Sequence, residues 1–226
     1  MNFADKMLQF LQTLHLPVTL PKGIEVMNPF LDTTTLEICR QFYQKYYQDE
    51  HLRWMILGIN PGRFGGGITG IPFTDPIRLQ NDCGINNPWS KKQELSSVFI
   101  YDMIRAFGGP EFFYKNFYIT AISPLGFTGN NKNLNYYDDK TLQSSIEGFV
   151  VDNLKRQLNF GIHRDVGFCL GEGINYRYLK RLNDSQHFFD TIVPLPHPRF
   201  IMQYRLKRKQ EYIEMYYKQL GKCADG

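Results

Sequence analysis

The sequence predicts an α/β fold, a three-layer α/β/α sandwich around a central, mostly parallel sheet of four strands. Four short apolar segments have the length and flanking residues of buried strands; they span residues 55–59, 117–122, 166–170 and 188–195. Segments with apolar residues at helical spacing separate them. Regular alternation of strands and helices is typical of a parallel sheet covered by helices.

Length and composition indicate one globular domain over residues 1–226, with the helices of residues 1–50 packed on it. The net charge of +4 is compatible with a nucleic-acid partner but does not require one. Asp5 and Lys6 interrupt the apolar residues at the N-terminus, which argues against a signal peptide, and no run is long enough to span a membrane. We therefore expect a cytoplasmic protein, and a monomer.

The cysteines do not form a metal-binding pattern. They are far apart in the chain and no C-x-x-C occurs among Cys39, Cys83, Cys169 and Cys223. We therefore expect neither a zinc site nor an iron–sulfur cluster, and no metal or other cofactor.

Three helices are expected before the second strand, from apolar periodicity and capping residues. They are residues 3–14, a helix capped by Asp32 or Thr33, and one from the capping box of Ser90 and Gln93 to Gly108. Residues 74–92 hold several Pro and Asn residues and are expected to be irregular.

Three more helices are expected after the second strand. They are a long helix over about residues 139–159, a short basic helix after Gly173, and a last helix over residues 203–220. A polar, Asn-rich loop over residues 129–135 precedes the first of them.

The segment 54–73 organises the candidate site. Pro61 and Gly62 end the first strand and place Asn60 at its carboxyl end, where open α/β sheets bind their ligands. A Gly-rich stretch follows at residues 65–70. It is compatible with a simple connecting turn, or with a phosphate-binding loop. The second interpretation lacks the lysine of a P-loop, and a lone G-x-G-x-x-G match is a weak signal.

Three strand ends carry polar residues outside the ordinary turn pattern, namely Asn60, Ser123 and His197. Because parallel strands place their carboxyl ends at one edge of the sheet, we expect these side chains to converge. This edge is the predicted site.

The segment also resembles a known family. It reads Gly58-Ile59-Asn60-Pro61-Gly62-Arg63-Phe64-Gly65 and, after three intervening residues, Thr69-Gly70-Ile71-Pro72-Phe73. This pattern is similar to the uracil-DNA glycosylase superfamily, and most closely to the single-strand-selective monofunctional uracil-DNA glycosylases. The resemblance implies the superfamily fold and removal of uracil from DNA, without strand cleavage, in base-excision repair.

A second motif follows the last strand, at Pro196-His197-Pro198-Arg199. Taken alone it is more typical of a surface turn, because His and Pro are common in loops. In the superfamily a His-Pro pair at this place stabilises the departing base, which implies this role for His197. The sequence after it departs from the single-strand-selective pattern, so we expect a distinct bacterial branch, with an activity on the DNA of the nucleoid.

The resemblance assigns the remaining site residues. Asn60 orients the attacking water, Phe73 stacks on the flipped base, and Phe64 belongs to the same base-binding segment. Gly62 stands where some relatives carry a tyrosine that blocks the 5-position of the ring, so 5-substituted uracils are expected to enter.

One base-reading residue of the family is missing. The family has an asparagine on the second strand where this chain has Ala121. Ser123, or an amide from residues 130–135, is left to replace it. Hypoxanthine, xanthine and mismatched bases therefore become candidate substrates.

An apolar tip beside basic residues is expected to contact DNA, single-stranded or double-stranded. We assign Met202 as a wedge into the base stack, with Arg199, Arg205 and Lys207 on phosphates. The alternative places Met202 on the inner face of the last helix. Two other functions remain open, a non-catalytic nucleic-acid-binding protein of this fold and a nucleotide-binding transferase that uses the Gly-rich loop.

Overall fold

The computed structural model describes residues 1–224 and confirms the predicted α/β architecture. The central sheet has the strand order β3-β2-β6-β7, and every pairing is parallel. Its strands are β2 (Arg53–Gly58), β3 (Phe117–Ala121), β6 (Ile162–Leu170) and β7 (Thr191–Leu195). All four lie at the predicted places, with ends shifted by a few residues.

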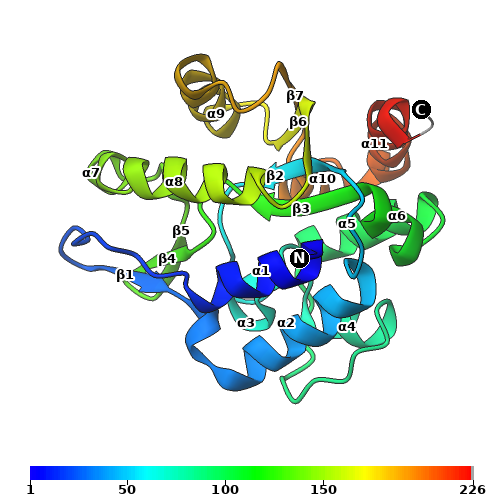
Figure 1. The fold of residues 1–226 in the computed structure, drawn as a ribbon, viewed down its shortest axis with the longest axis horizontal. Helices are drawn as coiled ribbons and strands as arrows, with labels where there is room; N and C mark the ends of the chain where they lie inside the picture. Colours follow the sequence, from blue (N-terminus) through cyan, green and yellow to red (C-terminus); the bar gives the residue numbers. More distant parts are fainter. Residues whose placement is uncertain (225–226) are drawn as a thin grey trace.

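Helices cover both faces of this sheet (Figure 1). The longer ones are α1 (Phe3–Gln12), α2 (Thr33–Tyr46), α5 (Leu95–Ala106), α8 (Glu147–Leu158), α9 (Ile174–Gln186) and α11 (Lys209–Ala224). The shorter ones are η1 (Pro29–Leu31), α3 (Gly66–Thr69), α4 (Pro76–Asn81), α6 (Pro110–Asn116), α7 (Lys140–Ser145), α10 (Pro198–Tyr204) and η2 (Leu206–Arg208). Within residues 1–224 no helix is long and apolar enough to cross a bilayer.

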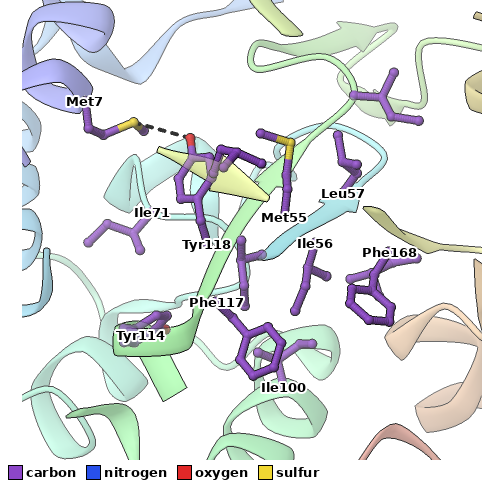
Figure 2. Close-up of a cluster of buried hydrophobic side chains, with 14 of the residues drawn as sticks. Met7, Met55, Ile56, Leu57, Ile71, Ile100, Tyr114, Phe117, Tyr118 and Phe168 are labelled. Carbon is purple, nitrogen blue, oxygen red and sulfur yellow. Dashed lines mark hydrogen bonds between the residues drawn. The ribbon is translucent and has the colours of Figure 1, made fainter. Parts of the chain in front are cut away.

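The two faces of the sheet are packed by different helices. On one face the Tyr118 hydroxyl contacts Met7 Sδ of α1 at 3.3 Å and Gln157 Oε1 of α8 at 2.7 Å. Figure 2 shows Ile100 of α5 beside Phe117, on the side of Ile56. Because side chains alternate between the faces of a strand, Phe117 and Tyr118 pack into opposite layers.

A second, three-stranded antiparallel sheet was not predicted. It has the order β1-β4-β5, from β1 (Ile24–Met27), β4 (Gly126–Gly129) and β5 (Lys132–Leu134). The residues expected to form a loop at 129–135 instead form the turn and second strand of a hairpin. Asn130 and Asn131 both have positive φ, 48° and 57°, as tight two-residue hairpin turns require.

Several predicted helix boundaries were wrong. The capping box of Ser90 and Gln93 does not form, and α5 begins after Glu94, whose backbone N–H donates to Asp75 Oδ2 at 2.9 Å. Asp75 is also the N-cap of α4, which lies in the segment expected to be irregular. The expected last helix over residues 203–220 is divided into α10, η2 and α11. The helix predicted to be short, α9, has 13 residues.

Candidate active site

The carboxyl ends of all four central strands open into one cavity of about 680 Å³. Each strand end contributes a residue to its lining. Gly58 and Ala121 are the last residues of β2 and β3, and Gly171 and His197 lie in the turns after β6 and β7. The volume falls within the range of about 300–1,000 Å³ that is typical of small-molecule sites. The cavity is where the sequence placed the site.

Phe73 lines this cavity and packs closely against the backbone of Gly58. A Cβ on Gly58 would lie 2.8 Å from the Phe73 ring, so only glycine permits this packing. Phe73 has a φ of 52°, a left-handed conformation that costs a non-glycine residue about 1–3 kcal/mol. The turn that contains Phe73 is stabilised by the Thr69 hydroxyl, which donates to the carbonyl of Thr74 at 2.7 Å. Backbone strain of this kind is concentrated at functional sites.

His197 lines the cavity as the N-cap of α10. Its Nδ1 accepts a hydrogen bond from the backbone N–H of Arg199 at 3.1 Å, which assigns the proton of the neutral ring to Nε2. Burial and the neighbouring Arg199 charge lower the pKa of His197 to about 4. At neutral pH the side chain is therefore an uncharged donor. Its ring centroid lies 6.0 Å from that of Phe73.

Asn60 lines the cavity, but its amide already has protein partners. Nδ2 donates to the carbonyl of Leu134 at 3.1 Å, and Oδ1 accepts from the N–H of Tyr136 at 2.9 Å. Asn60 thus ties the segment after β5 to the end of β2. Since an amide oxygen accepts two hydrogen bonds, Oδ1 retains one lone pair for a water.

Glu94 is a cavity residue that the sequence analysis missed. A Cβ on Gly62 would lie 3.1 Å from Glu94 Oε1, and one on Gly65 would overlap Oε2. Burial raises the pKa of Glu94 to about 7, and the nearby Asp75 adds to this rise. The only sequence signal was its position just before an apolar helical pattern, where an acidic residue is ordinary.

A stability measurement tests this carboxyl group. The pKa of Glu94 is higher in the folded chain than its ordinary value of 4.5, so the folded chain favours the protonated carboxyl group. The contribution of Glu94 to the free energy of unfolding is therefore fully present below pH 4.5 and is lost as the pH rises through 7. We expect the Tm of Glu94→Gln relative to the unsubstituted protein to be higher at pH 8 than at pH 4.5. A Tm difference that is constant over this range would show that Glu94 is not desolvated.

Ser123 does not line the cavity, which corrects its assignment as a base-binding residue. It is fully buried, and its hydroxyl donates to the carbonyl of Leu125 at 2.8 Å, which stabilises the turn after β3. Ala121 does line the cavity, and so do Asn133 and Asn135 from the segment left open as a replacement. Asn133 Nδ2 makes no hydrogen bond to any residue within 1–224, so this amide is free to bind a ligand.

The predicted wedge was also wrong. Met202 is only 9% exposed and packs in the core from α10, as the alternative interpretation had it. Phe64 is 43% exposed and lies outside the cavity lining, so it does not contact a base held there. Arg199, Arg205 and Lys207 are exposed as expected, and Arg199 belongs to the cavity mouth.

This fold and site define a class of protein. The family described as the Uracil DNA glycosylase superfamily matches residues 44–221, and the chain belongs to that superfamily. Among solved structures, the crystal structure of wild-type SMUG2 from Pedobacter heparinus is similar to the chain, with a TM-score of 0.97 and 49% sequence identity over 100% of both chains. SMUG abbreviates the single-strand-selective monofunctional group, so the resemblance seen in residues 58–73 is confirmed. No curated protein gives a significant match.

Proposed function

We propose that the protein is a monofunctional DNA glycosylase that removes uracil from DNA and leaves an abasic site, in base-excision repair. The observation that supports this proposal is that Asn60, Phe73 and His197 line one cavity, and each lies in a sequence motif that resembles the superfamily. An enzyme that acts on a base must extrude it from the stack, and a cavity at the strand ends provides room for the extruded base.

The reaction breaks the bond from C1′ of the sugar to N1 of uracil. The bonding electrons remain on the base, so negative charge develops on its O2 while the sugar becomes positive. Nε2–H of His197 donates to that oxygen, and the neutral ring makes this hydrogen bond without releasing a proton. A water held by the remaining lone pair of Asn60 Oδ1 adds to C1′ and loses its proton to solvent. Asn60 accepts no proton, so we expect a modest rate.

The cavity lining supports hydrolysis over strand cleavage. No lysine is among the lining residues of the described chain, and a Schiff base to the sugar requires an amine there. We therefore expect an intact strand with an abasic site as product.

We further propose that the substrate range extends beyond uracil. Ala121 provides no amide to read the polar edge of the base, and the small side chain leaves space in the cavity. Hypoxanthine, xanthine and 5-substituted uracils are the candidate additional substrates, with the amide of Asn133 as the available donor.

The ring of Phe73 provides the next test. Base–aromatic stacking is worth about 1–3 kcal/mol, so Phe73→Ala should lower kcat/KM for uracil about 5- to 150-fold. The control is Phe112→Ala, since Phe112 is exposed on α6 and absent from the cavity lining. Equal turnover by the two variants would mean that Phe73 only packs against Gly58.

One observation favours a second candidate function. The Asn60 amide is engaged with Leu134 and Tyr136, and Ala121 replaces the base-reading asparagine, as expected of a non-catalytic nucleic-acid-binding protein. By contrast, the Gly-rich stretch gives no support to a phosphate-binding loop. A Cβ on Gly67 or Gly70 would lie within 2.7 Å of Met27 or Cys39, so these glycines serve internal packing.

Chromatography of the free base separates the two candidates. The protein is incubated with a uracil-containing oligonucleotide, and released uracil is quantified beside a gel-shift measurement of binding. Release in proportion to time and enzyme supports the glycosylase. Binding with no release, at enzyme in excess over DNA, would instead establish the binding protein.

A further inference from the structure

Two groups of exposed aromatic rings and cations lie beside the cavity mouth. The first is on α10, where Phe200 and Tyr204 are 40% and 67% exposed and line the cavity. Their ring centroids are 5.7 Å apart, and the Arg205 guanidinium carbon lies 5.4 Å from the centroid of Phe200. We call Phe200, Tyr204 and Arg205 the α10 platform.

The second group is on the loop that follows β2. Phe64 projects from this loop, with the Arg63 guanidinium carbon 4.9 Å and Lys92 Nζ 5.7 Å from its ring centroid. Phe64 comes directly before Gly65, which contacts the cavity residue Glu94. We call Phe64, Arg63 and Lys92 the loop platform.

Exposure alone does not make an aromatic ring functional, because single exposed apolar residues are common on protein surfaces. The rings of the two platforms differ from such residues because they lie at or beside the cavity and have cations over them. Phe112 and Tyr217 are also exposed, but neither lines the cavity and neither has a cation over its ring within residues 1–224. Aromatic faces flanked by positive charge are the combination that binds single-stranded nucleic acid, since the rings stack on bases and the cations neutralise phosphates.

We propose that the α10 platform and the loop platform stack the unpaired bases next to the flipped nucleotide, so that the cavity mouth binds single-stranded DNA of at least three nucleotides. This inference rests on the proposed function, because it places the flipped base in the cavity. The competing occupant is duplex DNA, with Phe200 inserted between its base pairs as a wedge.

The test is a cycle that removes bases and rings independently. Fluorescence anisotropy measures binding of a labelled single-stranded 11-mer with a tetrahydrofuran abasic analogue at its centre. A second 11-mer also carries the analogue at both neighbouring positions, which removes the flanking bases. We expect the unsubstituted protein to bind the second strand at least about 30-fold more weakly than the first, as loss of two stacked bases at about 1–3 kcal/mol each implies.

The variants Phe64→Ala and Phe200→Ala/Tyr204→Ala should each lose part of this difference, while Phe112→Ala keeps it. Coupling of this kind distinguishes stacking from a general loss of binding. A difference that persists in both platform variants, or that is absent from the unsubstituted protein, would overturn the proposal. So would a Phe200 variant with weakened duplex binding and unchanged single-strand binding, which is the signature of a wedge.

The same proteins are assayed for release of uracil from a single-stranded oligonucleotide. If the unsubstituted protein releases uracil but its binding does not depend on the flanking bases, the proposed role of the two platforms is wrong and the glycosylase assignment stands. If the unsubstituted protein releases no uracil, the proposed function itself fails.

Discussion

Replacement of His197 by alanine is expected to lower kcat for uracil release about 10²- to 10³-fold, the usual loss when a donor to a developing oxyanion is removed. Nε2–H is the only ring donor, because Nδ1 accepts from the Arg199 N–H. Single-turnover excision from a uracil oligonucleotide measures the chemical step directly. An unchanged rate would remove His197 from the mechanism.

The control for this variant is His197→Gln, whose side-chain amide keeps an N–H donor and should recover part of the rate. Both variants lose the ring cap of α10, so a shared fall in Tm would report that structural role, whereas only the alanine variant loses the donor. The pKa of His197 is lowered to about 4, so the rate should show no inflection from this residue near pH 6.5. Lowering the pH from 6.5 toward 4 also destabilises the fold, because in this range the histidine is protonated in the unfolded chain but not in the folded one.

Replacement of Gly62 by tyrosine should exclude larger bases. The new Cβ would lie 3.1 Å from Glu94 Oε1 and 3.6 Å from Asn133 Nδ2. Gly62, Glu94 and Asn133 all line the cavity, so we expect the tyrosine ring to occupy part of it. Overpacking costs about 1–3 kcal/mol, from which we expect release of hydroxymethyluracil to fall about 5- to 150-fold. Competition between hydroxymethyluracil and uracil oligonucleotides in one reaction measures the change in specificity.

The matched control is Gly62→Ala, which adds one methyl group at ordinary contact distance from Asn133 and a slightly short one from Glu94. It should retain most of the activity on both bases. If Gly62→Tyr leaves hydroxymethyluracil release intact, the base does not bind in front of residue 62 and our placement of the pocket is wrong.

The central sheet was predictable because its strands are short continuous apolar runs separated by helical periodicity. The small sheet was not, because β1, β4 and β5 contain only three or four residues each, too few to show alternation. The pair Asn130-Asn131 was a usable signal, since asparagine tolerates the positive φ of a hairpin turn. The polar composition of the loop concealed it.

The candidate site was partly predictable for a similar reason. Strand ends converge by topology, so Asn60 and His197 reach the cavity whatever their neighbours are. Side-chain direction is set by local turns instead. Ser123 follows β3 at the same edge but turns inward to Leu125, and Met202 turns into the core because α10 begins earlier than apolar periodicity indicated. Glu94 reaches the cavity from a distant helix start, which no local pattern specifies.

The most direct test of the central assignment uses labelled oligonucleotides, single- and double-stranded, each with one uracil, hypoxanthine, xanthine or hydroxymethyluracil. After incubation each sample is divided, and only one half is treated with alkali, which cleaves abasic sites. We predict cleavage of the uracil strand in the alkali-treated half alone, which establishes a monofunctional glycosylase. Absence of cleavage on every substrate, by protein with a normal thermal transition, would contradict the assignment and leave the superfamily relationship as one of fold.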